Sequence, residues 1–583
     1  MARDLHTYLG HKIEFTRTVH TLPFLPNPNL AAQAWIARCE SPLQLRTSGP
    51  LAGLTFAVKD NMNVAGLPTT AGCPAFAFTP NEHAVVVHKL LAAGATLVGK
   101  TNLDQFACGL NGTRSPYGAV PNAFIADYVS GGSSSGSAYV VATGQVDFAL
   151  GTDTAGSGRV PAGLNNIVGI KPSKGLISTR GVLPAAQSVD CVSIFARTTA
   201  LAARVLEILA DYDPQDPYSR QLKLNAQPWG TTFRFGVPST CKFFGDTLSV
   251  AAFDRSVEQL KALGGVPVAI DYAPLAAAAD LLYNSALVAE RYAAIRQFFE
   301  AHESEVMEPV RSIIAKGRSY SAADLYSAQT LLRGYGQQAA AMWNDIDVLL
   351  VPTAPTHYTI AQMQADPIVL NRNLGEYTNF VNLLDYAAIS VPSSIRADGL
   401  PFGITLIGPC GSDWQLAELG QRLHHKTGLK QGFTVINLPP AQLIRVQAAM
   451  KKEAIMALAV VGAHLSGMPL NGQLAERGAQ LVQATTTAAH YRLYALPNTT
   501  PPKPGLKRVA AGGAAIAVEV WDVPVAQVGS FLALIPAPLG LGKVELADGS
   551  WVTGFICEGF ALDTAVDVTP FGGWRAYVQS INK

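Results

Sequence analysis

The chain has 583 residues, of which 43 are basic, 42 are acidic and 49% are hydrophobic. This length is more than one hydrophobic core usually organises, so two or three domains are expected. Because the charges balance, the composition argues against a nucleic-acid partner and against an anionic membrane surface. The apolar runs are too short to cross a membrane, and we expect no secretory signal at the start.

Seven cysteines are scattered along the sequence, and none belongs to a Cys-x-x-Cys pair. Such cysteines are typical of reduced thiols in a cytoplasm, whereas disulfide frameworks and zinc sites use paired, regularly spaced cysteines. The sequence also contains no His-Glu-x-x-His motif. We therefore expect a cytoplasmic protein that uses neither a metal nor a cofactor.

From residue 51 onward, short β-type runs alternate with helical runs. Examples are LTFAVKD (54–60), AVVVHKLLAAG (84–94) and ATLVGK (95–100). Strands separated by helices, with frequent glycine and proline between them, predict an α/β layer structure. Between about 245 and 345 the pattern predicts mainly helices, and strands are expected again at 347–355 and 403–409.

A second unit follows two adjacent prolines in INLPPAQ (436–442), which mark the end of the first unit. Beyond them the composition changes, and strand-like runs occur at 456–464, 491–497, 514–524 and 543–556. The sequence therefore predicts three parts, namely a first domain at 1–435, a linker at 436–454 and a small α+β domain at 455–583.

Two serines lie in glycine-rich loops that have the composition of a catalytic site. Ser133 lies in GGSSSGS, and Ser157 lies 24 residues later in GTDTAGSGRVPAG. A serine hydroxyl is a weak nucleophile until a neighbouring group takes its proton. The segment 89–356 contains a single histidine, His302, which is far from both loops in the sequence. A site in which lysine replaces histidine as the base is the economical interpretation.

Lys59 is the candidate base. The run LTFAV before it is apolar without alternation, which predicts a strand buried on both faces. Burial at the end of such a strand lowers the pKa of a lysine, and the neutral amine can then accept a proton. Lys100 is the rival base, but its position in a tight GKTN turn favours a structural role.

Three other interpretations compete with this one. GGSSSGS has the composition of a flexible linker, although an apolar helical run follows it directly. The same residues fit the G-x-S-x-G elbow of α/β-hydrolases with Ser134 as the nucleophile, but no strong strand precedes them. GATLVGKT (94–101) matches a phosphate-binding loop by letter. Because a helical run precedes that match and ATLV favours a strand, nucleotide binding is the weaker interpretation.

Six motifs, taken in order, resemble the amidase signature family over residues 25–430. They are KDN (59–61), GATLVGKTNLDQFA (94–107), SGGSSSGSA (130–138), GTDTAGSGRVPA (151–162), GIKPSKG (169–175) and GLPFGITLIGP (399–409). The resemblance implies a mixed β-sheet sandwiched by helices and a Ser–cis-Ser–Lys triad. By motif, Ser157 matches the nucleophile, Ser133 the bridging serine after a cis peptide bond, and Lys59 the general base.

The oxyanion hole of that family maps by motif to the backbone N–H groups of Thr154, Ala155 and Gly156, next to Ser157. Acyl transfer needs such fixed donors for the oxyanion that develops in the transition state. The family usually has glycine where this chain has Ala155. Since alanine carries a Cβ, the backbone there cannot require a glycine-only conformation.

Within the family, the segment 281–295 and the additional C-terminal domain resemble the allophanate hydrolases. In a single helix, Tyr283 and Arg291 would lie two turns apart on nearly one face. By resemblance they recognise a small anionic substrate, whose carboxylate a guanidinium can bind through two hydrogen bonds. The alternative is an amphipathic helix with an exposed arginine and a core tyrosine.

The C-terminal domain looks similar to the γ-glutamyl cyclotransferase-like fold, although Val461 and His464 depart from that family's opening pattern. In allophanate hydrolases this domain is associated with the carboxylated product of deamination, and His464 is the candidate residue. A core or loop histidine is an equally good interpretation, in which case the domain assists assembly.

The resemblance implies hydrolysis of allophanate (urea-1-carboxylate) with release of ammonia, in the second half of urea breakdown. The implied partners are a small anionic amide substrate, a second copy of the chain in a homodimer, and a functionally coupled urea carboxylase. Two alternatives remain open. One is a broader small-amide amidase of the malonamidase type, and the other is a non-catalytic amidotransferase-like scaffold subunit.

Overall fold

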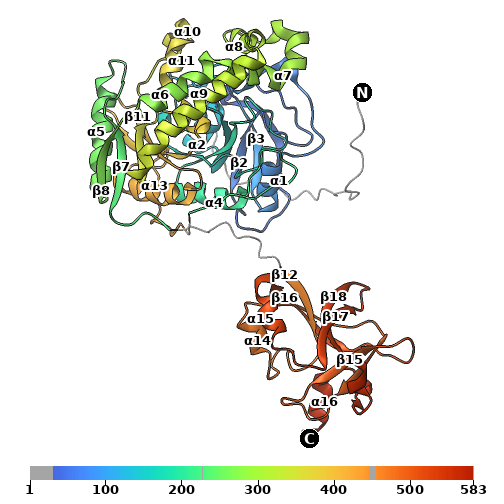
Figure 1. Cartoon of the computed structure of the whole chain (residues 1–583). Coiled ribbons are helices and arrows are strands. Elements are labelled where there is room, and N and C mark those ends of the chain that lie inside the picture. The colour runs from blue at the N-terminus through green and yellow to red at the C-terminus, as the bar shows by residue number, and fades with distance from the viewer. Residues whose placement is uncertain (1–30, 226, 445–454, 582–583) are drawn as a thin grey trace. The chain divides into compact units, whose positions relative to one another are not determined.

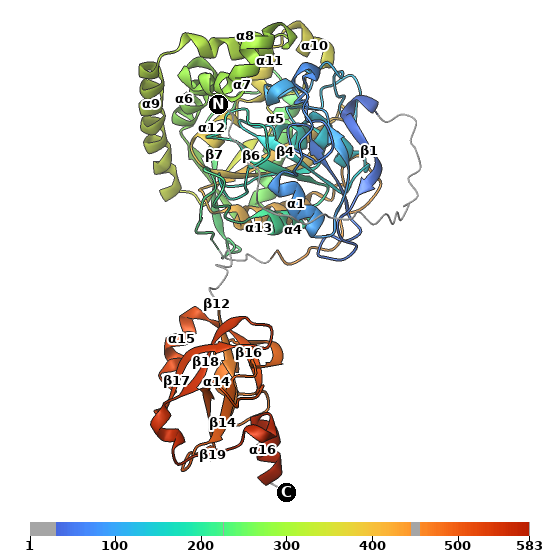
Figure 2. The same ribbon diagram turned by 90° about the vertical axis from the view of Figure 1, so that its right-hand side faces the viewer.

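The computed structural model describes residues 31–225, 227–444 and 455–581. The chain forms two compact units, Met1–Ala449 and Met450–Lys583, which are drawn in Figures 1 and 2. Each unit has a hydrophobic core of its own. Residues 445–454 of the predicted linker lie outside the described residues.

A mixed sheet of eleven strands runs through the described part of the first unit, in the spatial order β1-β3-β2-β4-β6-β5-β10-β11-β9-β7-β8. Strand β2 pairs in parallel with both β3 and β4, whereas β6 is antiparallel to both of its neighbours, β4 and β5. The strands are β1 (Trp35–Leu43), β2 (Thr55–Lys59), β3 (Thr96–Thr101), β4 (Phe148–Asp153), β5 (Val168–Lys171), β6 (Cys191–Ala196), β7 (Phe233–Pro238), β8 (Gly265–Ile270), β9 (Val348–Pro352), β10 (Ala387–Ile395) and β11 (Pro401–Gly408).

Helices cover both faces of this sheet, as Figures 1 and 2 show. Side chains of α1, α4, α5 and α13 belong to the large core on one face, and those of α2 belong to a separate core on the other. The helices are α1 (Val85–Ala92), α2 (Ser135–Ala142), α3 (Val160–Leu164), α4 (Thr199–Leu209), α5 (Thr247–Lys261), α6 (Ala273–Asn284), α7 (Ala289–His302), α8 (Val310–Ala315), α9 (Ala322–Ala340), α10 (Ile360–Ala365), α11 (Val369–Leu374), α12 (Asn379–Leu383) and α13 (Asp413–Thr427).

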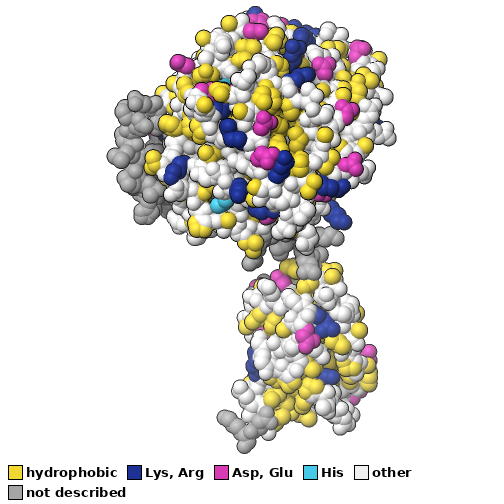
Figure 3. Space-filling view, turned by 90° about the vertical axis from the view of Figure 1, so that its left-hand side faces the viewer, with side chains coloured by type: hydrophobic (Ala, Val, Ile, Leu, Met, Phe, Trp, Pro, Cys, Tyr) yellow, Lys and Arg dark blue, Asp and Glu magenta, His cyan; other side chains and the backbone are white. Residues whose placement is uncertain are grey.

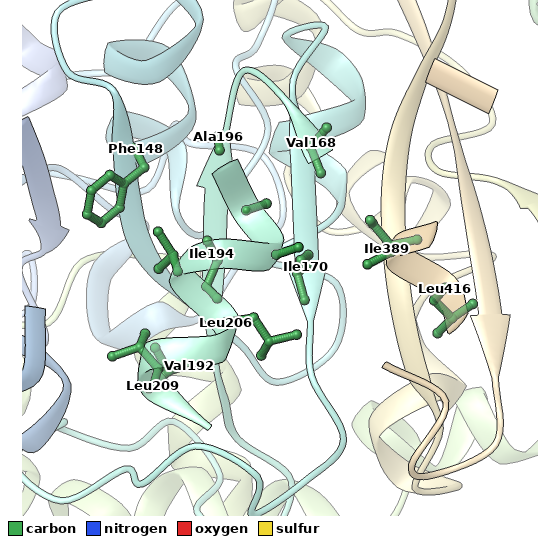
Figure 4. Close-up of a cluster of buried hydrophobic side chains, with 14 of the residues drawn as sticks. Phe148, Val168, Ile170, Val192, Ile194, Ala196, Leu206, Leu209, Ile389 and Leu416 are labelled. Carbon is green, nitrogen blue, oxygen red and sulfur yellow. The ribbon is translucent and has the colours of Figure 1, made fainter. Parts of the chain in front are cut away.

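The central strands contribute to both cores, because successive side chains of a strand point to opposite faces of the sheet. Phe56 and Phe148 stack within the large core, part of which is shown in Figure 4. Ala57 and Ala149 belong to the core that contains α2. Lys59 follows Ala57 by two residues and therefore points toward α2, whose first turn begins inside GGSSSGS at Ser135.

The expected α/β class, with a large mixed sheet and helices on both sides, is confirmed. The segment between about 245 and 345 is mainly helical, as predicted, but it also contains strand β8, which was not predicted. It is an edge strand with exposed Val266 and Pro267, and an edge position tolerates a proline that lacks an N–H. The strand is short and its burial does not alternate regularly, so the sequence pattern does not separate it from the helices around it.

The second unit contains a five-stranded sheet, in the order β13-β16-β12-β18-β17, and a three-stranded sheet, β15-β14-β19, within its described residues. All four strand-like runs predicted for this unit form strands, the last of them as the hairpin β17–β18. The elements are β12 (Ile455–Val460), α14 (Gly472–Ala475), β13 (Gln480–Thr486), β14 (Tyr491–Ala495), β15 (Pro504–Arg508), β16 (Ala517–Pro524), α15 (Val525–Leu532), β17 (Leu539–Glu545), β18 (Trp551–Cys557), β19 (Val566–Asp567) and α16 (Trp574–Ile581).

The surface carries mixed charge. On the face in Figure 3, basic and acidic side chains are interspersed without a large field of one sign, which agrees with the balanced composition. Within the described ranges, no helix combines the length and the apolar character that a membrane span requires.

Candidate active site

The amine of Lys59 is completely buried at the end of β2. Its Nζ donates hydrogen bonds to Ser133 Oγ at 2.7 Å, to Thr152 Oγ1 at 2.8 Å and to Ser134 Oγ at 3.1 Å. These hydroxyls come from the GGSSSGS loop and from the end of β4. The lysine side chain therefore points into a pocket of hydroxyl groups and away from bulk water.

Burial lowers the pKa of Lys59 to about 7. The negative charges of Asp104, Asp190 and Asp153 act in the opposite direction, but the loss of hydration dominates. A substantial fraction of this amine is therefore neutral near neutral pH. A neutral amine has a lone pair and can take a proton from a hydroxyl.

Asp104 holds the loop that carries Ser133. Its backbone N–H donates to the carbonyl oxygen of Ser133 at 3.1 Å, and its carboxylate accepts the N–H groups of Asn111, Gly112 and Arg114. The peptide bond between Gly132 and Ser133 is cis. Sequence reasoning missed Asp104, although it lies in the quoted motif GATLVGKTNLDQFA.

Ser157 lies in the turn between β4 and α3 and is 3% exposed. Among the described residues, its Oγ donates to the carbonyl oxygen of Gly109 at 3.5 Å and makes no hydrogen bond with Ser133. The loop containing Gly109 continues to Asn111, whose backbone N–H faces Gly132. The structure therefore brings the two serine loops against a common neighbour but leaves the serine hydroxyls unbonded to each other.

The turn before Ser157 has free backbone donors. The N–H groups of Thr154, Ala155, Gly156 and Ser157 donate no hydrogen bond to another described residue. Such N–H groups remain available for an oxyanion. The residues predicted for an oxyanion hole therefore have the donor capacity that this role needs.

A buried ion pair braces the same turn. Arg159 donates from Nε and Nη2 to the two carboxylate oxygens of Asp153, both at 2.9 Å, and both side chains are fully buried. Asp153 also accepts the N–H of Gly158 at 2.9 Å. Although burial alone would raise the pKa of Asp153, Arg159 holds it below its usual value. The pair links the end of β4 to the start of α3.

Gly156 allows a close approach that no other residue would permit. A Cβ at this position would lie 2.3 Å from Thr378 Oγ1, far inside the contact distance of the two atoms. The neighbouring Ala155 is buried with its methyl group in place and without a positive φ. The glycine requirement of this turn therefore falls on residue 156 and not on residue 155.

Lys100, the rival base, makes a different set of contacts. Its Nζ forms a buried ion pair with Asp60 Oδ1 at 2.8 Å and donates to Thr69 Oγ1 at 2.8 Å. Lys100 lies at the end of strand β3, as the strand-like run before it predicted, and this position argues against a phosphate-binding loop. Burial lowers the pKa of Lys100, and the Asp60 carboxylate acts against this shift as its ion-pair partner, which agrees with a structural role.

Tyr283 and Arg291 meet, but not on one helix as expected. Helix α6 ends at Asn284, and Ser285 adopts an extended conformation, with φ −139° and ψ −180°. Its side chain accepts the N–H of Leu287 and starts a short 3-10 helix before α7. The chain bends there, and the guanidinium of Arg291 lies 5.4 Å from the centre of the Tyr283 ring.

The guanidinium of Arg291 is buried without hydrogen-bond partners for two of its nitrogens. The residue is 4% exposed, and Nε and Nη1 have no acceptor among the described residues. The interpretation with an exposed arginine is therefore wrong. Burial alone would lower the pKa of Arg291, but Tyr283 and Asp190 are among the neighbours that raise it above its ordinary value. The group remains charged and has unused donors.

His464 belongs to the second unit and follows β12. Its ring stacks on Phe555 with 5.1 Å between ring centres, and Nε2 is hydrogen-bonded to Gln473 Oε1 at 2.9 Å. Burial lowers its pKa, so the ring is neutral near neutral pH. It lines a small cavity of about 30 Å³ together with Lys503.

These features agree with comparisons to known families. Residues 6–417 match the Amidase family model, and residues 456–579 match the model of the allophanate hydrolase C-terminal domain. The chain therefore belongs to the amidase family, whose members act on amide bonds.

Particular relatives extend the match over both units. The urea amidolyase of Saccharomyces cerevisiae is 45% identical over 548 residues, which cover 92% of this chain and 30% of that protein. The urea amidolyase of Lachancea kluyveri is 44% identical over 552 residues, again with 92% of this chain and 30% of that protein covered. An allophanate hydrolase structure from Kluyveromyces lactis has a TM-score of 0.69 at 41% identity, with 96% of this chain and 95% of that chain covered. The chain thus spans about a third of the length of the urea amidolyases that it matches.

Proposed function

We propose that this chain is an allophanate hydrolase, which releases ammonia from the terminal amide of urea-1-carboxylate. The observation that carries the proposal is the buried, incompletely bonded guanidinium of Arg291 in a chain with a buried Lys59–Ser133 contact. Such a guanidinium favours an anionic ligand, and the lysine–serine contact supports acyl transfer. The likeness to an allophanate hydrolase structure over both units adds support.

In the proposed reaction, Ser157 Oγ attacks the terminal amide carbon of the substrate. Its proton passes to Ser133 as the proton of Ser133 passes to neutral Lys59. The C–N bond then breaks, and the proton returns through Ser133 to the departing nitrogen, which leaves as ammonia. Ser133 suits this relay because a hydroxyl both donates and accepts.

Water completes the cycle. It attacks the acyl-enzyme and loses a proton to the same relay, which returns that proton to Ser157 Oγ. The product ⁻OOC–NH–COOH leaves and ionises in water to ⁻OOC–NH–COO⁻. The free N–H groups of Thr154, Ala155 and Gly156, next to Ser157, would stabilise the oxyanion in both halves of the reaction. Loss of CO₂ from the product would follow.

Arg291 would bind the carboxylate of the substrate through its unused donors, and the Tyr283 hydroxyl would orient it. A planar guanidinium can form two parallel hydrogen bonds with a carboxylate, and a buried site strengthens both. By holding the carboxylate, Arg291 and Tyr283 would also fix the position of the terminal amide, which lies at a set distance from the carboxylate within the substrate.

The decisive experiment measures ammonia release by the purified full-length chain from three amides. Allophanate and malonamate both carry a carboxylate and differ by NH against CH₂, whereas malonamide is neutral. We expect the highest kcat/KM for allophanate. Equal turnover of malonamate would favour a malonamidase-type amidase, and no release from any of them would favour a non-catalytic amidotransferase-like scaffold.

Substitution of Arg291 by lysine tests the carboxylate contact. We expect Arg291→Lys to raise KM for allophanate about 10- to 100-fold, because a point charge does not replace the two-pronged contact. Turnover of malonamide should change little. Arg296→Lys is the matched control, since Arg296 is an exposed arginine on the same helix. Equal losses on allophanate and on malonamide would contradict the proposed contact.

The second unit would act on the carboxylated product through His464. We expect His464→Gln to slow CO₂ release relative to the first ammonia, because the buried neutral ring could no longer exchange a proton. Ammonia and CO₂ can be followed in the same stopped-flow assay, with a detector whose signal does not depend on pH. His490→Gln changes an exposed histidine of the same unit and serves as the control. Unchanged CO₂ release in His464→Gln would favour a role of the unit in assembly.

The remaining parts of the proposal concern organisation. We assign residues 1–435 to the catalytic domain, 436–454 to a linker and 455–583 to a γ-glutamyl cyclotransferase-like domain. A cytoplasmic homodimer that receives its substrate from a urea carboxylase fits this assignment. The urea amidolyases that match this chain are about three times longer, which leaves room for further activities in those proteins.

A further inference from the structure

Asp190 is a partly buried carboxyl group that the proposed reaction does not use. It lies immediately before β6, in the sequence SVDCVS, and its partners come from three directions. Thr154 Oγ1 donates to its Oδ1 at 2.5 Å. The backbone N–H of Ala185 donates to its Oδ2 at 2.8 Å, and that of Ala186 lies 3.2 Å from the same oxygen.

The pairing of β4 with β6 brings Asp190 to the catalytic turn. These antiparallel strands end with Asp153 opposite Cys191. Continuing the register by one residue places Thr154 opposite Asp190, and their side chains complete the contact. Thr154 is the first residue of the turn whose N–H groups precede Ser157. The carboxyl group therefore fixes the end of that turn.

The loop before Asp190 is also tied to helix α7, which carries Arg291. Ser188 donates from its N–H and from its hydroxyl to the two carboxylate oxygens of Glu290, both at 2.7 Å. Asn382 donates to the carbonyl oxygens of Val189 and Asp153, at 2.9 and 2.7 Å. One short segment thus contacts the end of β4 and the start of the helix of the proposed substrate-binding arginine.

We propose that Asp190 is a positioning residue, which holds the Thr154–Ser157 turn in register with the Arg291 guanidinium and supplies a fixed negative charge to both Lys59 and Arg291. This inference rests on the proposed function and adds a residue that acts through Thr154 without touching the substrate. Its geometric basis is the set of hydrogen bonds from Thr154 and from the 185–190 loop.

The charge of Asp190 acts on both Lys59 and Arg291. Burial raises the pKa of Asp190 to about 6, so the group is mainly ionised near pH 7. Its charge raises the pKa of Lys59, together with Asp104 and Asp153, and it raises the pKa of Arg291. Glu290 also acts on Arg291 from the same helix. Removing the charge of Asp190 should therefore lower the pKa of Lys59.

The test uses full-length Asp190→Asn and follows kcat/KM against pH. We expect kcat to fall about 10- to 100-fold, because the amide cannot accept from Thr154 and from both backbone N–H groups. The acid limb, which reports protonation of Lys59, should move to lower pH by roughly half a unit. A purely structural residue would lower activity without moving that limb.

Two further variants separate the hydrogen bond from the charge. Thr154→Val removes the donor but keeps the carboxyl group, so kcat should fall. The acid limb should move less than in Asp190→Asn, because the loss of this hydrogen bond raises the pKa of Asp190 without removing its charge altogether. The double variant Asp190→Asn/Thr154→Val should lose little more activity than Asp190→Asn alone, since both substitutions break the same hydrogen bond. Asp413→Asn is the matched control for folding, because Asp413 is a buried carboxyl group that is likewise bonded to a hydroxyl and a backbone N–H, those of Ser173.

Some results would overturn the inference. A wild-type kcat in Asp190→Asn would do so. A loss of activity in Asp190→Asn would also do so if the acid limb does not move and Tm falls by as much as it does in Asp413→Asn. If Asp190→Asn does not fold, a wild-type kcat in Thr154→Val decides against it.

The proposed substrate can fail separately. Allophanate that releases no ammonia with the wild-type chain refutes that part. The same pH comparison can then be made with p-nitrophenyl acetate, which needs only the acyl-transfer residues.

Discussion

Ser157→Ala should abolish ammonia release, with a loss of at least about 10⁴-fold in kcat, because no other group would form the acyl-enzyme. The fold should be unaffected, since within the described part of the chain the hydroxyl makes a single hydrogen bond of 3.5 Å, to Gly109. Rapid acid quenching with p-nitrophenyl acetate, followed by peptide mass spectrometry, should find the acyl group on the peptide of the wild-type chain that contains residue 157 and on no peptide of the variant.

Ser134→Ala is the matched control, because Ser134 is the nucleophile of the competing G-x-S-x-G interpretation. Its hydroxyl accepts from Lys59 at 3.1 Å and donates to the carbonyl oxygen of Thr152 at 3.2 Å. Loss of these contacts should weaken activity but should leave acylation of residue 157 detectable. An acyl group on residue 134 of the wild-type chain, with activity retained in Ser157→Ala, would reverse the assignment.

Lys59→Met should lower kcat by about 10² to 10⁴-fold, because the site would lose its proton acceptor while keeping a side chain of similar length. The wild-type kcat/KM should fall as the pH drops below about 7, since the amine of Lys59 has a pKa of about 7 and is inactive when protonated. The variant should lose this acid limb. A pH–rate profile from pH 5 to 9 measures both effects.

Lys100→Met is the control for burial of a lysine. Lys100 is paired with Asp60, so its replacement leaves a buried carboxylate without its partner and should lower Tm by several degrees. Lys59 has no carboxylate within the salt-bridge distance among the described residues, so Lys59→Met should not destabilise the fold in this way. Wild-type activity in Lys59→Met would eliminate the proposed base.

Local pattern was sufficient to predict the position of Lys59. An apolar run without alternation predicted a doubly buried strand, and β2 ends at Lys59 inside the protein. The same reasoning separated Lys100 from a phosphate-binding loop, because the residues before it form β3. Both arguments needed only the neighbouring residues, whose polarity and β-propensity decide a buried strand.

Residues whose roles depend on strand order could not be predicted in this way. Asp190 is a single acidic residue in SVDCVS, and only the antiparallel pairing of β4 with β6 brings it to Thr154. Periodicity also failed at Ser285, because the apolar spacing continues while the backbone turns. The Asn284–Ser285 pair was the available signal, since such residues favour turns and caps.

The close contact at Gly156 limits how this protein could be engineered. A methyl group there would overlap the Thr378 hydroxyl, whereas Ala155 already tolerates one. Mutant libraries that seek acceptance of bulkier amides should therefore keep the glycine codon at 156 fixed. Diversity is better placed at Leu110, whose side chain lies beside the same glycine and can be shortened without a new overlap.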